Sequence, residues 1–325
     1  MLRKKIKIDH FVLALLLTIA VARFFPNGAT WSKPVSLHQV GDVGITLVFL
    51  FYGLRLNLKI LRNDLKNWKL HLVVQLSTFL LFPLLVLPFV LIFGKGENHL
   101  LWIGAFFLAA LPSTVSSSVV MVSIAKGNIP GAIFNASLSS LLGVFVTPLW
   151  MGIVLAADPA QSTDFTAIIS KLILQVLTPV ITGIFLNRFF GRWAESKSRY
   201  LKLFDQAVIL LIVYLAFAGS FLKNQFSAIG NLDLMLVALL CLSLFFSVYF
   251  IIYFIALKLH FNRKDTISAQ FSGSKKSLVH GTVMSKVLFH GMSGAGVILL
   301  PLMVYHALQL IVVGFIAREK SKTED

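Results

Sequence analysis

Two runs of polar residues interrupt long apolar segments of this 325-residue sequence. The run at 112–118 places five hydroxyl residues after Pro112, and the run at 272–277 contains Gly273 beside Lys275 and Lys276. Hydroxyls, backbone groups freed by a helix break and lysine ammoniums all bind ions or polar solutes, so these runs predict non-covalent binding. The candidate substrate-binding residues are Ser113, Thr114, Ser116, Ser117, Ser118, Asn135, Gly273, Ser274, Lys275, Lys276 and Ser277.

No acidic residue is expected to lie at the same depth in the membrane as Lys275 and Lys276. The 13 Asp and Glu residues all fall in loops, in tails or in the outermost turns of apolar segments. A buried lysine without a carboxylate must be hydrated, lose its proton or meet an anion from outside. We favour the anion, with loss of the proton as the alternative. Each run also has a simpler interpretation. The first could be a kinked helix whose serines form hydrogen bonds within the protein, and the second could be a loop outside the membrane spans.

The residues do not form a catalytic motif. Ser277 directly follows Lys276, and adjacent residues on a helix do not face each other, so they do not make a Ser-Lys dyad. The sequence contains no Gly-x-Ser-x-Gly elbow, no His-Glu-x-x-His metal motif and no nucleotide-binding loop. Its one cysteine, Cys241, lies in an apolar run, which excludes a disulfide framework or a thiolate cluster. We therefore expect no enzyme activity, no bound cofactor and no ATP-driven pump.

The composition predicts an integral membrane protein. Apolar residues make up 57% of the chain and charged residues 13%, and the mean hydropathy is +0.86. Globular proteins are about half apolar and a quarter charged. The net charge of +16 would suggest a nucleic acid in a soluble domain. Here the basic residues lie between apolar runs, so we expect a lipid bilayer as partner and no nucleic acid.

Ten all-helical membrane spans are expected, because each needs about 20 apolar residues. They lie near 11–25, 40–56, 70–93, 100–126, 130–156, 165–187, 204–222, 232–257, 266–290 and 294–316. The first resembles a signal peptide, but we expect it to stay attached because it completes a repeat. The segments 57–69 and 188–203 are expected to be basic loops. With both termini in the cytoplasm, 20 Lys and Arg residues lie inside and three outside, as the positive-inside rule requires.

The two halves of the chain share one pattern of spans. Spans starting at 40, 70, 100 and 130 correspond to spans starting 162 to 166 residues later. Five spans per half is an odd number, so the second half, 165–325, must be inverted relative to the first, 1–164. The polar runs interrupt the fourth span of each half. Interrupted helices at corresponding positions of an inverted repeat mark the binding site of secondary transporters.

Several motifs resemble the bile acid:sodium symporter superfamily, in particular its SBF-like branch. They are PSTVSS at 112–117, AKGN at 125–128, FNA at 134–136, GVFVTP at 143–148, KSL at 276–278, KVLF at 286–289 and PLMVYH at 301–306. The resemblance covers nearly the whole chain. It implies a panel domain of spans 1, 2, 6 and 7, and a core domain of spans 3–5 and 8–10 in which the broken helices, spans 4 and 9, cross.

The sodium-binding residues implied by the resemblance are mostly absent. Ser118 matches the serine of a Ser-Asn pair that binds sodium in coupled members, but Val119 replaces the asparagine. Ala132 and Ala136 replace two hydroxyl ligands on the next helix. A Glu-x-Gly-x-Gln-Asn motif falls on 271–276, where phenylalanine replaces the glutamate and two lysines replace the amides. Sodium coupling is therefore in doubt, and neither Na+ nor H+ coupling follows from the sequence.

These patterns predict a secondary transporter that moves a small organic anion by alternating access. The alternative is a regulatory membrane protein that influences ion or lipid handling without a large transport flux. We expect the protein in a bacterial inner (cytoplasmic) membrane.

Overall fold

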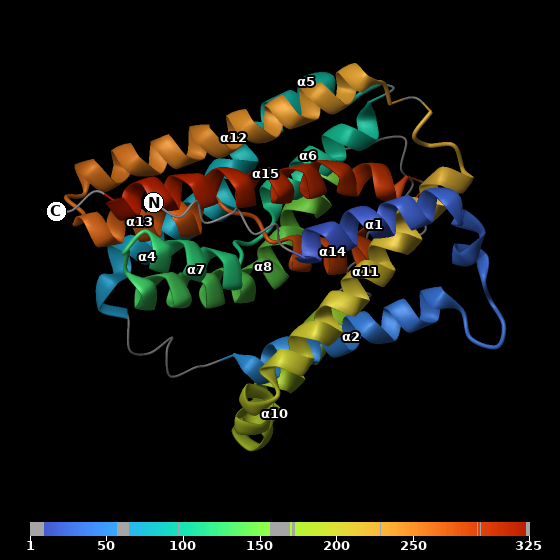
Figure 1. Ribbon diagram of the computed structural model, residues 1–325, viewed down its shortest axis with the longest axis horizontal. Helices are drawn as coiled ribbons and strands as arrows, with labels where there is room; N and C mark the ends of the chain where they lie inside the picture. Colours follow the sequence, from blue (N-terminus) through green and yellow to red (C-terminus); the bar gives the residue numbers. More distant parts are fainter. Residues whose placement is uncertain are drawn as a thin grey trace, which may run out of the picture.

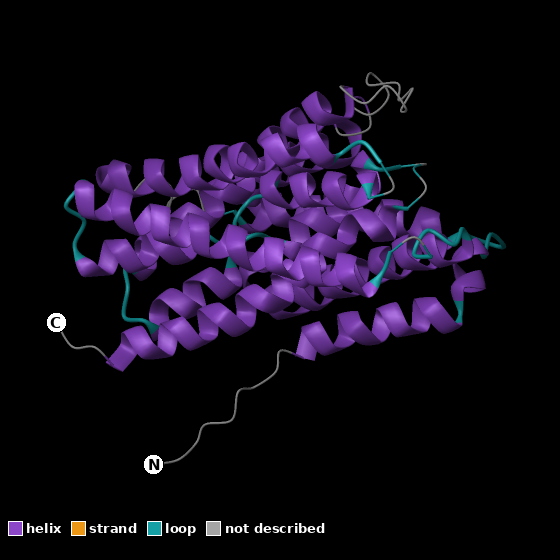
Figure 2. Ribbon diagram, turned by 90° about the horizontal axis from the view of Figure 1, so that it is seen from above, coloured by secondary structure: helices purple, strands orange, loops and turns teal. Residues whose placement is uncertain are grey.

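The computed structural model describes residues 10–56, 65–96, 98–156, 170, 173–227, 229–290, 292 and 294–322. Helices are the only regular secondary structure in these ranges, and no strand is present in them. Most helices run roughly along the long axis of the molecule, as Figure 2 shows from above. The all-helical architecture expected from the sequence is thus confirmed for the described part of the chain.

Seven helical segments of the described chain are long and apolar enough to cross a membrane. They are α2 (Leu37–Arg55), the continuous segment Trp68–Phe93, α8 (Ile129–Ala156), the segment Ile173–Ser196, α11 (Ser198–Leu222), α12 (Asn231–Lys258) and α15 (Ala295–Lys322). The segment Trp68–Phe93 consists of α4 (Trp68–Leu76), a π-helical stretch over Ser77–Leu81 and α5 (Phe82–Phe93). The segment Ile173–Ser196 is a π-helical stretch over Ile173–Leu177 followed by α10 (Thr178–Ser196). Two shorter apolar helices are α1 (His10–Phe24) and α6 (His99–Ala110).

The outward faces of these helices are apolar. Helix α10 exposes Phe185 and Phe189, which retain 79% and 71% of their accessible surface, and α12 exposes Leu232 and Met235 to a similar extent. Water does not tolerate contiguous apolar patches of this kind, whereas lipid does. The structure therefore supports an integral membrane protein, as the composition predicts.

Four helices pack into one group beside the rest. Helix α1 packs against α11, and α2 packs against both α10 and α11; these elements lie together at the right and bottom of Figure 1. The α2–α10 contact is close because both helices present glycine. A Cβ added to Gly53 would lie 2.4 Å from the Val180 carbonyl oxygen, and one added to Gly183 would lie 2.2 Å from that of Leu50. Small residues allow such backbone approach between membrane helices.

The fourth and ninth predicted spans are interrupted. Helix α6 ends at Ala110 and α7 (Ser116–Ile124) follows the break; α13 (Arg263–Gly273) and α14 (Leu278–Leu288) flank the second. Corresponding helices start 164 and 162 residues apart (263 − 99 and 278 − 116). Pro112 lacks an N–H and cannot continue α6. Ser277 starts α14 by accepting a hydrogen bond from the His280 N–H.

The expectation of a basic loop over 188–203 is wrong. Helix α10 continues to Ser196 and α11 begins at Ser198, so Lys197 alone separates them. A predicted span ends at the first charged residues after an apolar segment. The helix itself can continue beyond the bilayer, because charged side chains there remain in water. The segment 57–64 and most of 157–172, including the predicted start of the sixth span, lie outside the described residues.

Candidate binding site where two interrupted helices meet

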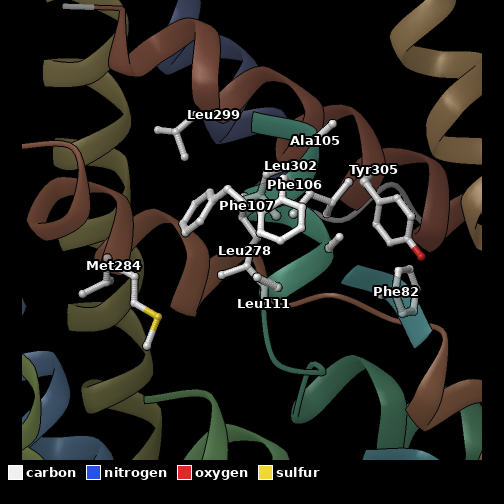
Figure 3. Close-up of a cluster of buried hydrophobic side chains, with 14 of the residues drawn as sticks. Phe82, Ala105, Phe106, Phe107, Leu111, Leu278, Met284, Leu299, Leu302 and Tyr305 are labelled. Carbon is white, nitrogen blue, oxygen red and sulfur yellow. The ribbon is translucent and has the colours of Figure 1, made fainter. Parts of the chain in front are cut away.

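The two breaks contact each other directly. The Ser277 N–H donates to the Pro112 carbonyl oxygen at 2.9 Å, and the Ser113 hydroxyl donates to the Ser272 carbonyl at 2.5 Å. Leu111 and Leu278, beside the two breaks, lie in one cluster of buried side chains in Figure 3. Backbone groups released by one break are therefore satisfied by the other, as buried backbone requires.

The carbonyls at the end of α6 all have identified partners. Ala109 and Leu111 accept from the Lys276 ammonium at 2.7 and 2.8 Å. Ala110 accepts from the Thr147 hydroxyl at 2.8 Å, and Pro112 accepts from the backbone of the second break. Carbonyls at a helix end carry partial negative charge. The end of α6 is thus a site that favours positive charge, and a lysine fills it.

Carbonyl oxygens and an aromatic ring surround the Lys276 ammonium. Its ammonium donates a third hydrogen bond, to the Thr78 carbonyl at 2.7 Å, and lies 4.1 Å from the centre of the Phe82 ring. Three carbonyls can only accept, so the nitrogen must donate three hydrogens, and only the ammonium form has three. Gln309 holds the backbone of Lys276, accepting from its N–H at 3.0 Å and donating to its carbonyl at 2.9 Å. Lys276 thus has no hydrogen left for a substrate in this conformation.

Lys275 is placed differently. It is also fully buried, but its ammonium donates to the Ser117 hydroxyl at 2.9 Å, in the first turn of α7. The N-terminus of a helix carries partial positive charge, and Val115, which precedes α7, provides no side-chain cap. Among the described residues no carboxylate pairs with Lys275. Two sources of positive charge therefore converge there.

Most other predicted site residues gather at the same place. Thr114 shares hydrogen bonds of 2.8 Å with the hydroxyls of Ser117 and Ser118. Ser274 accepts from the Tyr305 hydroxyl at its carbonyl, 2.6 Å away. Ser116 begins α7, and Gly273 ends α13, where an added Cβ would lie 2.6 Å from Ile252.

Asn135 forms its hydrogen bonds with α4 and within α8. Its carbonyl and side-chain oxygen accept from Gln75 of α4, at 3.1 and 3.2 Å, so it ties α8 to α4. The candidate binding residues did not include Thr78 and Phe82, which complete the surroundings of Lys276. The sequence held a partial signal, because Pro83 in an α-helix would release the carbonyl four residues earlier, that of Phe79. The π-helical register, which the sequence does not reveal, makes Thr78 the released carbonyl instead.

A model of the SBF-like CPA transporter family matches residues 9–322. The chain belongs to the SBF-like CPA transporter family. Protein PA2026 of Pseudomonas aeruginosa is 37% identical over 98% of this chain and 94% of its own length. YfeH of Escherichia coli K12, whose name marks it as a candidate symporter, is 34% identical over 98% of this chain and 94% of its own length. Sodium/bile acid cotransporter 7 of Xenopus tropicalis is 29% identical over 95% of this chain and 91% of its own length.

Membership of this family makes the chain a membrane transporter and not an enzyme. Of the sodium-site positions implied by the resemblance, Ser118 accepts from Thr114 or donates to it. Ala132, Ala136 and Phe271 have no side-chain oxygen and are fully buried. In this SBF-like transporter the remaining positions are Val119, which also has no side-chain oxygen, and the two lysines described above.

A pocket of about 260 Å³ opens between α11, α14 and the start of α15. Basic and imidazole side chains line it together with Ser220 and Ser285: Lys223, Lys286, His38 and His290. Lys286 donates to Asp42 and to the His38 carbonyl, both at 2.6 Å, and so joins α14 to α2. The pocket therefore lies where the group of α1, α2, α10 and α11 meets the interrupted helices.

Proposed function

We propose that this SBF-like transporter is a secondary transporter that moves a small organic anion by alternating access. The proposal includes ten spans in two inverted halves, 1–164 and 165–325, with both termini in the cytoplasm of a bacterial cell. A panel of α1, α2, α10 and α11 would move against a core that contains both breaks. Two observations support this arrangement. The helices around the two breaks correspond at similar offsets in the two halves. Helix α1 packs on α11 and α2 packs on α10 and α11, while α11 also contacts α14 and α15, where panel and core would meet.

The contrast between the two adjacent lysines carries the choice of an anion. Lys276 lies at the negative end of α6 and has three carbonyl partners. Lys275 lies at the positive end of α7 and has a hydroxyl partner. A buried ammonium beside a helix N-terminus is stabilised by an anion, since both attract negative charge. Lys275, with Ser117 and the first turn of α7, is therefore the proposed contact for the carboxylate, sulfate or phosphate of the substrate.

The pocket beside Lys286 also favours a negatively charged substrate. Its basic lining would raise the local concentration of anions. The contact between Lys286 and Asp42 would have to separate when the panel moves away from the core on that side.

Exchange in proteoliposomes tests the function. Purified protein is first screened by thermal shift against carboxylates, sulfonates and phosphate monoesters, because a ligand raises the melting temperature by mass action. Each compound that stabilises the protein is then loaded inside vesicles, and uptake of its labelled form is measured with and without protein. Protein-dependent, saturable exchange of an anion is expected. Stabilisation by anions without any exchange would refute the proposed transport of an anion and favour the regulatory alternative. Exchange of cations or neutral solutes alone would refute an anion as the substrate.

A further inference from the structure

The surroundings of Lys276 are those of a cation site. Three carbonyl oxygens converge from two separate segments: Ala109 and Leu111 at the end of α6, and Thr78 between α4 and α5. The Phe82 ring covers a further side at 4.1 Å. Carbonyls at unwound helix ends are the groups that replace water around alkali cations in channels and transporters. Here an amino group of the chain itself stands among them.

The backbone explains why these carbonyls are available. In the π-helical stretch the Phe82 N–H bonds to Ser77, and the next residue, Pro83, has no N–H to offer the Thr78 carbonyl. At the end of α6, the Ser113 N–H bonds to the Ser139 hydroxyl instead of reaching back to Ala109. The carbonyls of Thr78 and Ala109 thus have local causes, and together with that of Leu111 they form a site that needs a positive charge.

We infer that the Lys276 ammonium is a tethered cation that takes the place of a free monovalent cation between α6 and the α4–α5 segment. It neutralises the carbonyl end of α6 permanently, so the crossing of the two interrupted helices needs no dissolved ion to hold together. The inference concerns the cation requirement alone. It does not rest on the proposed anion, and it would stand if the substrate were of another kind.

Truncation of the lysine should convert the site into one for a free cation. The experiment measures the melting temperature of purified wild-type protein, Lys276→Ala and Lys276→Met in choline, sodium, potassium, ammonium and methylammonium chlorides at one ionic strength. Wild type should melt at the same temperature in all five salts. Lys276→Ala should melt roughly 6–20 °C lower in choline, since three buried carbonyls lose their hydrogen-bond donor. Ammonium or methylammonium should restore part of that loss saturably, because either can donate to the same carbonyls.

Lys276→Met is the matched control. Its side chain fills the space but carries no charge, so the loss should remain in every salt. The inference is overturned if Lys276→Ala gains nothing from any small cation over choline, if it fails to fold in every salt, or if Lys276→Met is as stable as wild type. Saturable stabilisation of the wild type by sodium over choline would also overturn it.

A second measurement keeps the lysine and does not depend on those variants folding. Fluorinated phenylalanine at position 82 weakens the attraction between ring and cation with little change of shape. The melting temperature should fall stepwise with mono-, di- and trifluorination at Phe82, and less for the same series at Phe106, which is equally buried and has no cation over its ring among the contacts described. Equal effects at the two positions would show that the amine over Phe82 is uncharged, contrary to the inference.

Discussion

Replacing Lys275 with glutamine separates anion binding from stability. The ammonium makes one hydrogen bond, to the Ser117 hydroxyl at 2.9 Å, and glutamine can make the same bond without the charge. Losing a charge-assisted hydrogen bond to the substrate costs about 1.5–3 kcal/mol, which weakens anion affinity by about one to two decades. The melting temperature without ligand should hold or rise, because a buried charge without a carboxylate partner has been removed.

The same replacement at the neighbouring lysine should give the opposite pattern. Glutamine at position 276 has two N–H donors for three carbonyls, and its own oxygen would face another acceptor. Leaving two buried acceptors unpaired at about 1–3 kcal/mol each costs about 3–5 kcal/mol in the middle of that range, or roughly 6–20 °C in melting temperature. Lys276→Gln should therefore lose stability first and affinity only as a consequence.

The assay titrates each folded variant with an anion found by the thermal-shift screen, at fixed pH and ionic strength, and records Kd beside the melting temperature. The reasoning fails if Lys275→Gln binds the anion as the wild type does and melts at a lower temperature. That result would make Lys275 structural and move the search for the site to the hydroxyls at 113–118.

Three further predictions test the elements around the site. Gln309→Leu should lower the free energy of unfolding by about 2–4 kcal/mol, because the buried N–H and carbonyl of the Lys276 backbone each lose a partner; an unchanged denaturation midpoint would contradict this. Gly183→Ala should destabilise the α2–α10 contact and lower the melting temperature, whereas Gly219→Ala, with open space around it, should not. Thiol labelling of whole cells should reach a cysteine at Asn224 and not one at Ser196; the reverse would invert the topology.

The breaks and their contact could be expected from the sequence, and the different surroundings of the two lysines could not. Pro112 cannot continue α6, so the position of the first break follows from residue type. The second break falls where Gly273, Ser274 and two lysines interrupt an apolar segment. Lys275 and Lys276 are identical in type and adjacent, and they lie between helices, where no periodicity assigns them to a face. Their directions depend on which carbonyls are free nearby, and the Thr78 carbonyl comes from a segment almost 200 residues away.

Asn135 shows a second limit of prediction from the sequence. A polar residue on an apolar span is a reasonable candidate for a binding site, but its side chain serves equally well between helices. Its partner Gln75 lies on α4 and donates to the Asn135 side-chain oxygen, while the Asn135 amide nitrogen donates to the Gly131 carbonyl. Sequence spacing placed Asn135 on the helix beside the first break, and only the rotation of α8 determines which neighbour it meets.

The crossing of the interrupted helices creates two places of opposite electrostatic character. The end of α6 presents carbonyls and attracts a cation, and the start of α7 presents N–H groups and attracts an anion. In a transporter that couples a dissolved cation to an anion, the first place would be free to bind the cation and the second to bind the anion. In this chain Lys276 occupies the first place through bonds to the backbone, while Lys275 reinforces the second. If Lys276 supplies the cation as inferred, positive charge at Lys275 remains free to attract a solute, which is why we propose an anion as the substrate.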